Sequence, residues 1–255
     1  MSLRKLATKA NPNCDQSEND DEKAKKQTTV ALGKGSEVVL IPRFISFDRA
    51  WSWFDYLNTK IPWTRPTIRV FGRSCLQPRD TCYVANPGLP HFVYSGYQPH
   101  AYSWDDLPPL KELLEAVHKA LPGSSFNSLL LYRYKGGNDY VAWHSDDEKV
   151  YGSTPEIASL SFGCEREFFL KKKPSRTSQE RKSDQESSSK RLKRNHDDQH
   201  SFMLKHGSLL VMRGLCSDIR VLGMLQLGIS RSLQWKYLIC LQQLLSGPNA
   251  DRTEL

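Results

Sequence analysis

The sequence predicts an α+β protein in which two helices buttress a two-sheet β-sandwich or jelly roll. Apolar residues recur at helical spacing in two early segments, which begin near Ser46 and Pro108. After residue 125 the pattern changes to short runs rich in Leu, β-branched and aromatic residues, separated by Gly, Asn, Asp and Pro. The 255 residues with 38% hydrophobic content suffice for one core. Helices followed by many short strands favour this layout.

Boundary signals place each element in turn. Ser46 can cap a helix that ends by Pro62, and the helix from about Pro108 stops at Pro122 and Gly123. The second helix is amphipathic, with four leucines and Val117 on one face. The clearest predicted strands cover residues 126–134, 157–162, 166–170 and 208–212.

The net charge of +8 is concentrated in one polar stretch. Residues 171–206 hold 11 Lys+Arg against 5 Asp+Glu, and we expect 171–201 to form a flexible basic insertion loop. Its K-R-x-K-R cluster at 190–194 suits nuclear import, which predicts a nuclear protein, or phosphate contact; a solvated loop without a partner is the alternative. Residues 1–37 are expected to be a disordered polar tail.

Several classes of protein are disfavoured by composition. No window approaches the roughly 18 apolar residues of a membrane span, and the first residues lack the apolar region of a signal peptide. The six cysteines contain no C-x-x-C pair, which argues against a disulfide framework or a zinc ribbon. We therefore expect a soluble, monomeric intracellular protein with reduced thiols and no membrane partner.

One short motif carries potential metal chemistry. His144 and Asp146 follow an apparent strand, and residues two apart in an extended segment project from the same side. An imidazole and a carboxylate are two thirds of the facial triad that holds non-haem Fe(II) and leaves three positions open. By itself His-x-Asp is a weak signal, and a surface histidine beside an acidic loop is the alternative.

A series of linked motifs surrounds this pair. They run as R-Y-K at 133–135, H-x-D-D-E at 144–148, P-x-I-A-S-x-S-F-G at 155–163, R-x-F at 166–168 and H-G-S-L-L-x-M at 206–212. In this order they closely resemble the AlkB family of Fe(II)- and 2-oxoglutarate-dependent oxygenases, in its nucleic-acid-dealkylating branch. The resemblance covers roughly residues 40–213.

The resemblance implies a double-stranded β-helix, which is a cupin-like jelly roll, over residues 38–214. It further implies Fe(II) as cofactor, 2-oxoglutarate and O2 as co-substrates, and repair of DNA damage by oxidation of N-alkyl groups on bases. Succinate and formaldehyde are the products. His144 and Asp146 would be the catalytic metal ligands, and Tyr134 would contact 2-oxoglutarate.

The resemblance also implies substrate contacts to DNA with N-alkylated bases. Asp147 and Glu148 would face the base, where carboxylates accept from an exocyclic amine and favour a cationic lesion. Phe71 matches a hairpin that inserts an aromatic wedge when a base is flipped out of the duplex. The alternative for Phe71 is that its ring packs in the core. The alternative for Asp147 and Glu148 is that they are solvated acids of a loop.

Further residues would line the base pocket. Phe92 and Tyr94, spaced two apart on an expected strand, would stack on the flipped base, and Arg79 would lie on the same side. The rival interpretations are a non-catalytic nucleic-acid-binding module and, within the family, an RNA or protein demethylase.

The chain departs from the family pattern after Gly214. The expected W-x-H-x-x-P and R-x-N-L-T-F-R motifs are absent, no His follows His206, and His206 matches a non-ligand His of the family. The second metal-binding His and the Arg that binds 2-oxoglutarate are therefore not found, and Tyr132 stands where the family has an Asn. We expect 215–255 to be an atypical tail that leaves C-terminal strands missing or replaced and a sheet edge unpaired. This Leu-rich tail could bury itself, with a helix against the open sheet as one arrangement.

Overall fold

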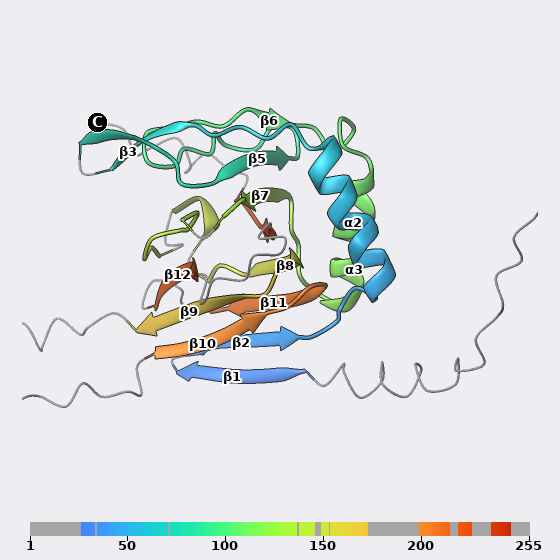
Figure 1. Cartoon of the computed structure of the whole chain (residues 1–255). Helices are drawn as coiled ribbons and strands as arrows, with labels where there is room; N and C mark the ends of the chain where they lie inside the picture. The colour runs from blue at the N-terminus through green and yellow to red at the C-terminus, as the bar shows by residue number, and fades with distance from the viewer. Residues whose placement is uncertain are drawn as a thin grey trace, which may run out of the picture.

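The protein folds into two facing β-sheets with two helices against the larger sheet (Figure 1). The computed structural model describes residues 27–33, 35–70, 72–136, 138–145, 149–152, 154–172, 199–214, 219–225 and 236–245. No helix in these ranges is long and apolar enough to cross a membrane. The α+β jelly-roll prediction is confirmed.

The larger sheet has eight strands in the order β1-β2-β11-β8-β13-β7-β5-β6, and the smaller one has the order β10-β9-β12. A separate hairpin joins β3 to β4. The strands are β1 (Thr28–Gly33), β2 (Ser36–Ile41), β3 (Thr67–Val70), β4 (Arg73–Leu76), β5 (Asp80–Ala85), β6 (Ala101–Tyr102), β7 (Ser128–Tyr134), β8 (Ile157–Gly163), β9 (Arg166–Lys172), β10 (Gln199–Leu204), β11 (Ser208–Arg213), β12 (Ile219–Leu225) and β13 (Lys236–Gln242).

The helices α2 (Phe47–Lys60) and α3 (Pro109–Ala120) lie where the sequence predicts them. Ser46 precedes α2 without a capping hydrogen bond from its side chain. The apolar faces of both helices bury Leu57 and Leu110 completely against the outer face of the larger sheet, where Leu160 and Tyr237 contribute. Each such side chain stabilises the fold by about 1.5 to 3 kcal/mol, so this layer fixes the helices to the sheet.

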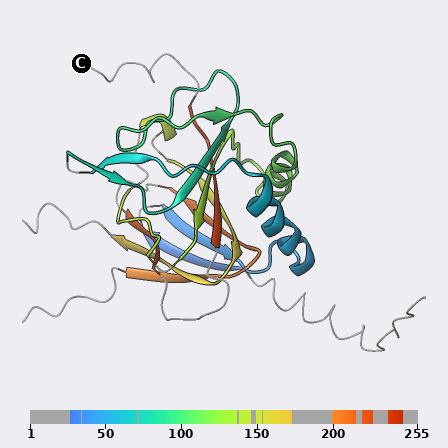
Figure 2. The ribbon, with the colours of Figure 1, turned by 45° about the horizontal axis from the view of Figure 1, so that its top comes forward.

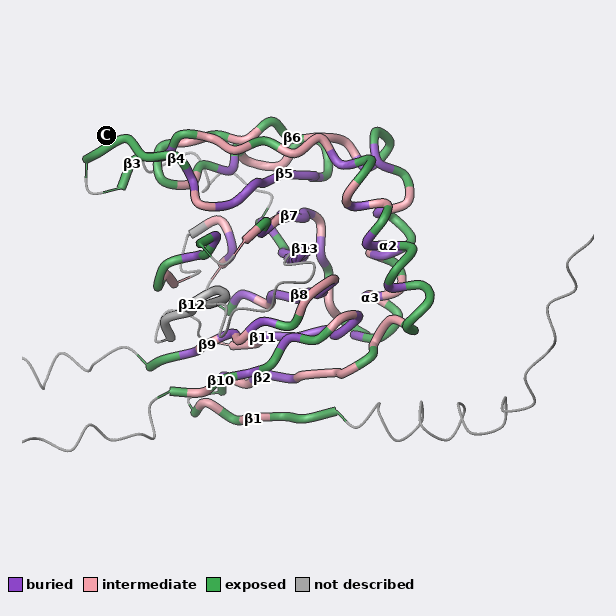
Figure 3. Tube along the Cα trace, viewed as in Figure 1, coloured by how far each residue is buried: buried purple, intermediate pink, exposed green. Residues whose placement is uncertain are grey.

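A second core fills the space between the two sheets. Tyr134 on β7 and Leu238 on β13 meet Phe168 and Leu204 from the smaller sheet. Figure 3 shows this interior as buried, in contrast to the exposed strand β4. Because side chains alternate along a strand, the central strands β2, β11, β8, β13 and β7 of the larger sheet contribute to both cores.

The C-terminal tail completes the larger sheet. All seven residues of β13 pair with both β7 and β8, from Lys236 opposite Tyr134 and Gly163 to Gln242 opposite Ser128 and Ile157. Figure 2 shows this C-terminal strand, coloured red, within the larger sheet. The tail thus replaces a strand, as the fold prediction allowed. The expectations of a tail helix and of an unpaired sheet edge are wrong for these residues, because a vacancy between two strands favours a third strand that satisfies both sets of backbone groups.

Two other boundaries also need correction. Residues 1–37 were expected to be disordered, but β1 and the start of β2 lie within that range and form an antiparallel pair. The proposed insertion loop 171–201 is shorter, because β9 extends through Lys172 and β10 begins at Gln199, paired with Lys171. Residues 173–198, including the basic cluster at 190–194, lie outside the described residues.

Candidate active site

A cavity opens between the two sheets where β7, β8 and β13 face the segment around His144. Its open volume is about 40 Å³. The structure thereby brings Tyr134 and His144, ten residues apart in sequence, to one site. The lining residues are Tyr132, Tyr134, Val141, His144, Ile157, Ser159, Phe168, Met212, Leu238, Cys240 and Gln242.

Tyr134 offers a hydroxyl to this cavity. Its side chain is completely buried, and Oη has no hydrogen-bond partner among the described residues. Burial raises the pKa of Tyr134, so the phenol stays protonated and can donate. An unsatisfied buried hydroxyl costs about 1 to 3 kcal/mol, which a ligand with an acceptor oxygen would relieve.

His144 is half-buried at the cavity wall. Its Nδ1 lies 2.9 Å from the carbonyl oxygen of Ala142, so Nδ1 carries the proton and donates to that carbonyl. In the neutral ring this places the lone pair on Nε2, the atom that a metal ligand must offer. The local geometry is therefore compatible with the predicted role of His144 as a ligand.

The other acidic and aromatic candidates lie outside the described residues. They are Phe71, Asp146, Asp147 and Glu148, so their roles remain predictions. Within the described ranges no group of three or more His, Cys, Asp and Glu side chains could hold a metal ion. His206 is engaged elsewhere: Nδ1 accepts a hydrogen bond from the Gly163 amide at 2.9 Å, and its ring centroid lies 4.3 Å from that of Trp51.

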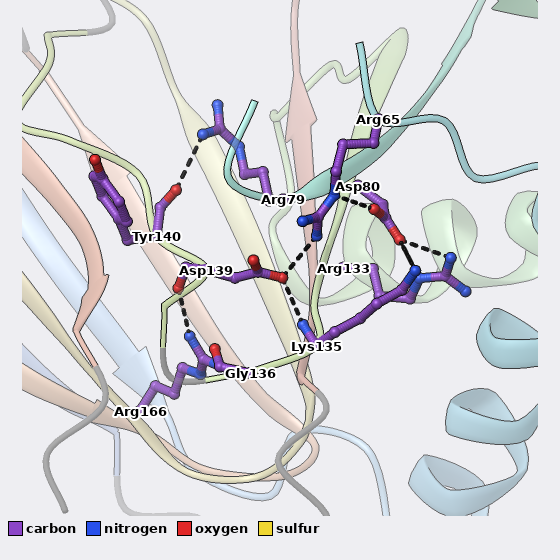
Figure 4. A network of polar contacts seen from close by, with 9 residues as sticks. All are labelled: Arg65, Arg79, Asp80, Arg133, Lys135, Gly136, Asp139, Tyr140 and Arg166. Carbon is purple, nitrogen blue, oxygen red and sulfur yellow. Dashed lines mark hydrogen bonds and ion pairs between the residues drawn. The ribbon is translucent and has the colours of Figure 1, made fainter. Parts of the chain in front are cut away.

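A network of charged side chains connects strands β5 and β7 with the loop that contains Asp139 (Figure 4). Asp80 accepts from Nε and Nη2 of Arg133 at 2.9 and 2.7 Å, from Nε of Arg65 at 2.7 Å, and lies 2.8 Å from Nζ of Lys135. Burial alone would raise the pKa of Asp80, but the hydrogen bonds from Lys135, Arg133 and Arg65 outweigh it and hold that pKa below its usual value. This network joins β5 to β7.

The same network holds the loop that leads toward His144. Asp139 accepts from Nη2 of Arg65 and from the Lys135 amide, both at 2.8 Å. Arg166, which is 1% exposed, donates to the carbonyl oxygens of Asp139 and Gly136 at 2.9 and 2.8 Å. The sequence marked Arg166 only as part of a motif. Its structural role is to hold the backbone of this loop against β9.

An aromatic cleft adjoins the cavity through Tyr132, which lines both. Phe92 and Tyr94 lie in this cleft, so the structure brings these two predicted base-pocket residues together. The expected strand is wrong, because they belong to a loop in which the Tyr94 and Tyr97 backbones form a bridge. Phe92 is itself buried, with its ring stacked on Tyr83 at 5.2 Å between centroids.

Arg79 packs against two of the aromatic rings that line this cleft. It is 3% exposed, its guanidinium lies 4.8 Å from the ring of Tyr132 and 5.9 Å from that of Tyr94, and it donates to the carbonyl oxygen of Tyr140 at 3.2 Å. These are cation–π and backbone contacts. Its predicted contact with substrate stays a prediction, while its observed contacts fix the aromatic rings.

The tail strand β13 adds residues that sequence reasoning did not single out. Leu238, Cys240 and Gln242 line the cavity. Lys236, two residues before Leu238, is completely buried and donates from Nζ to the carbonyl oxygen of Leu204 at 2.5 Å. Burial is the main cause that lowers the pKa of Lys236 to about 7; Cys164 and Glu165 act in the opposite direction, and Arg166 acts in the same direction as burial.

Residues 37–217 match the 2OG-Fe(II) oxygenase superfamily. With this fold and cavity, the match defines the class: the chain belongs to the 2OG-Fe(II) oxygenase superfamily. Its AlkB branch is indicated by 65% identity over 193 residues to the DNA oxidative demethylase ALKBH2 of Arabidopsis thaliana, covering 75% of this chain and 62% of that protein. The human alpha-ketoglutarate-dependent dioxygenase alkB homolog 3 is 37% identical over 141 residues, which are 54% of this chain and 47% of that protein.

Solved structures support the fold. The structure of OsALKBH1 superposes with a TM-score of 0.51 at 14% identity and covers 81% of this chain and 97% of its own. The chain spans less than two thirds of the length of the two curated relatives it matches. The matched superfamily segment ends at residue 217, so β12 and β13 lie beyond it.

The family implies Fe(II), 2-oxoglutarate and O2. For 2-oxoglutarate one donor fits, because the unpartnered hydroxyl of Tyr134, a lining residue of the cavity, can donate a hydrogen bond to a carboxylate. The open volume holds only a few water molecules, so flexible side chains such as Met212 must move to admit the co-substrate. For iron, the predicted ligands are His144 and Asp146. Of these two side chains the structure describes only His144.

Proposed function

We propose that this chain is an Fe(II)- and 2-oxoglutarate-dependent dioxygenase that removes N-alkyl groups from bases in DNA. The observation that carries the proposal is the cavity lined by Tyr134 and His144 inside a 2OG-Fe(II) oxygenase fold. The identity with a plant DNA oxidative demethylase supports DNA as the substrate.

When bound, Fe(II) with 2-oxoglutarate and O2 supplies the oxidising power that hydroxylates an N-methyl group, which then leaves as formaldehyde. The protein positions the reactants. His144 offers Nε2 to the metal while its Nδ1–H is held by Ala142, and Tyr134 donates its hydroxyl toward the co-substrate. Asp146 is the predicted carboxylate ligand.

Substrate recognition is assigned to the aromatic cleft. Phe92 and Tyr94 lie beside Tyr132, which also borders the cavity, so a base in the cleft lies next to the reaction site. Aromatic stacking contributes about 1 to 3 kcal/mol per base. Phe71 is proposed to take the place of the flipped base in the duplex, and the cluster at 190–194 to direct the protein to the nucleus.

The test is formaldehyde release from duplex DNA carrying N-methylated bases, measured with Fe(II), 2-oxoglutarate and O2. Release that requires 2-oxoglutarate and is lost in His144→Ala supports the proposal. Matched RNA and single-stranded DNA oligonucleotides determine the preferred nucleic acid. Binding of methylated duplex without any release contradicts the enzymatic proposal and favours a non-catalytic binding module, which the absence of His from residues 207–255 would explain.

A further inference from the structure

The loop between β7 and β8 carries two large aromatic side chains that face solvent. Tyr140 is 43% exposed and Trp143 is 39% exposed. Their neighbours point the other way, since Val141 is buried and lines the cavity together with His144. One side of this loop therefore builds the candidate metal site, and the other side presents two aromatic rings next to it.

The backbone that carries these rings is held in place by β5 and β9. The Tyr140 amide donates to the carbonyl oxygen of Pro78 at 3.1 Å, and the Tyr140 carbonyl oxygen accepts from Nη1 of Arg79 at 3.2 Å. Nη1 of Arg166 donates to the carbonyl oxygen of Asp139 at 2.9 Å. A side chain on a fixed backbone loses less conformational freedom when it binds a ligand than one on a mobile loop, so the two rings are preorganised for contact.

This loop is continuous with the aromatic cleft through one guanidinium. Arg79 lies 4.8 Å from the ring of Tyr132 and 5.9 Å from that of Tyr94, and it also donates to Tyr140. Figure 4 shows the ring of Tyr140 pointing away from the charged network. A DNA strand that places one base in the cleft thus has Tyr140 and Trp143 beside the next part of its path.

The charge around the loop suits the phosphates of such a strand. In the described network five cationic side chains stand against two carboxylates, and two of the cations reach the surface. Arg65 is 30% exposed and Lys135 is 45% exposed at the side chain. Phosphate contacts supply affinity without sequence preference. The members of the network are Arg65, Arg79, Arg133, Lys135 and Arg166 with Asp80 and Asp139.

We propose that Tyr140 and Trp143 stack on bases that neighbour the alkylated base in the same DNA strand. The inference rests on the proposed function, because it takes the alkylated base to lie in the aromatic cleft. Every base has a π-face, so this stacking platform accepts any neighbouring sequence. The platform holds the strand on both sides of the flipped base while the lesion lies next to His144.

The central experiment uses the unmodified full-length chain and fluorescence anisotropy. The probe is single-stranded DNA with one N-methylated base, whose neighbouring bases are free to stack. A matched probe keeps the lesion and every phosphate but has abasic residues on both sides of the lesion. We expect the abasic probe to bind at least tenfold more weakly, because phosphate contacts remain while stacking is lost. Equal affinity for the two probes would overturn the platform.

Variants assign the stacking to this loop. Trp143→Ala should weaken binding of the intact probe about tenfold and leave binding of the abasic probe unchanged, and Tyr140→Ala should show the same pattern. Trp143→Phe retains a ring and should keep most of the affinity. The matched control is Trp51→Ala, because Trp51 has the same exposed fraction of 39% but lies on α2. That control should bind as the wild type does.

An equal loss of affinity for both probes in Trp143→Ala would show that its ring does not contact the neighbouring bases, and it would overturn the platform. Tryptophan emission gives an independent readout. The chain has six tryptophans, and the difference in emission between wild type and Trp143→Phe isolates Trp143. The intact probe should quench this difference and the abasic probe should not. Equal emission with either probe contradicts the platform.

Formaldehyde release separates this inference from the proposed function. Release by a chain whose binding depends neither on Trp143 nor on the neighbouring bases would overturn the platform alone. Binding that depends on both, without release, would support the platform and contradict the proposed enzymatic function. A wild-type chain that binds neither probe contradicts both.

Discussion

Arg133 donates to Asp80 through both Nε and Nη2, at 2.9 and 2.7 Å, although 53 residues separate them in the chain. The pair joins neighbouring strands β5 and β7, where Asp80 lies opposite Arg133 in the register. With Arg65 it connects to Asp139 and so to the loop before His144. The charge network therefore holds the loop that precedes the candidate metal ligand.

Asp80→Asn should destabilise the protein by about 3 kcal/mol, because it leaves Arg133 and neighbouring cations without their buried counter-charge. Denaturant melts measure the change. The control is Asp105→Asn, which removes an ion pair to Lys111 from an 81% exposed carboxylate and should cost less than about 1 kcal/mol. Equal losses in both variants would show that the network contributes no more than a surface pair.

Asp80 also predicts a dependence of stability on acid. Its folded-state pKa lies below the unfolded value, so its contribution is present above about pH 4 and is lost as the pH falls through the folded pKa. The melting temperature of Asp80→Asn should therefore fall less steeply than that of the wild type between pH 4 and the folded pKa. Parallel slopes for the two proteins would contradict this assignment.

Local periodicity predicted those elements that have a one-sided apolar pattern. Both helices and strands β7, β8, β9 and β11 lie within a few residues of their expected bounds. The pair β1 and β2 was missed because a charged tract precedes it, although Val38 and Val39 of β2 are buried. The order of linked motifs placed Tyr134 and His144 at one site, and in the structure both residues line the same cavity.

Other features depend on tertiary partners and could not be inferred from the chain. The segment from Lys236 to Gln242 has no alternation that distinguishes strand from helix, and its conformation is decided by the space between β7 and β8. Likewise, a lysine in an apolar run gives no sign that it lies opposite Tyr134. The charge network around Asp80 requires the register of β5 against β7, which local sequence does not specify.

Lys236 predicts that stability rises with pH above neutrality. Its pKa is lowered from 10.5 to about 7 on folding, so above pH 7 the unfolded chain binds more protons than the folded one. The free energy of unfolding should increase by up to about 1.4 kcal/mol per pH unit in that range. Thermal melts between pH 7 and 8.5, without 2-oxoglutarate, measure the effect as the difference between wild type and Lys236→Met.

Lys236→Met should be more stable than the wild type at pH 7, with a difference that shrinks toward pH 8.5. The stability of each protein alone should level off near pH 9, because Cys82, whose pKa burial raises to about 12, opposes the trend once the unfolded thiol ionises; Cys82 is common to both proteins and leaves their difference unchanged. A constant difference between the two proteins across this range would mean that Lys236 does not titrate near neutrality.

Metal binding should depend on His144 and be weak, because a second histidine ligand is absent from residues 207–255. We expect the wild type to bind Co(II) with an affinity in the micromolar range or weaker, and His144→Ala to reduce it at least tenfold. His206→Ala should leave it unchanged, because its Nδ1 accepts from Gly163 and its ring lies against Trp51. Absorption spectra of the Co(II) complex measure the affinity of the wild type and of each variant. Loss of binding in His206→Ala would identify it as the missing ligand.

The tail strand should be essential for folding. A chain that stops after Gly214 loses β13, all seven residues of which are buried and paired on both sides. Burial of side chains such as Ile239 and Leu241 contributes about 1.5 to 3 kcal/mol each, so their sum is comparable with the whole stability of a domain, about 5 to 15 kcal/mol. The truncated chain should also expose the edges of β7 and β8, which favours aggregation. We expect no cooperative melt by circular dichroism.

A chain that stops after Leu245 retains β13 and is the control; it should melt cooperatively. A cooperative melt of the shorter chain near the temperature of the control would show that the tail is dispensable and that β7 and β8 are stable without the strand between them.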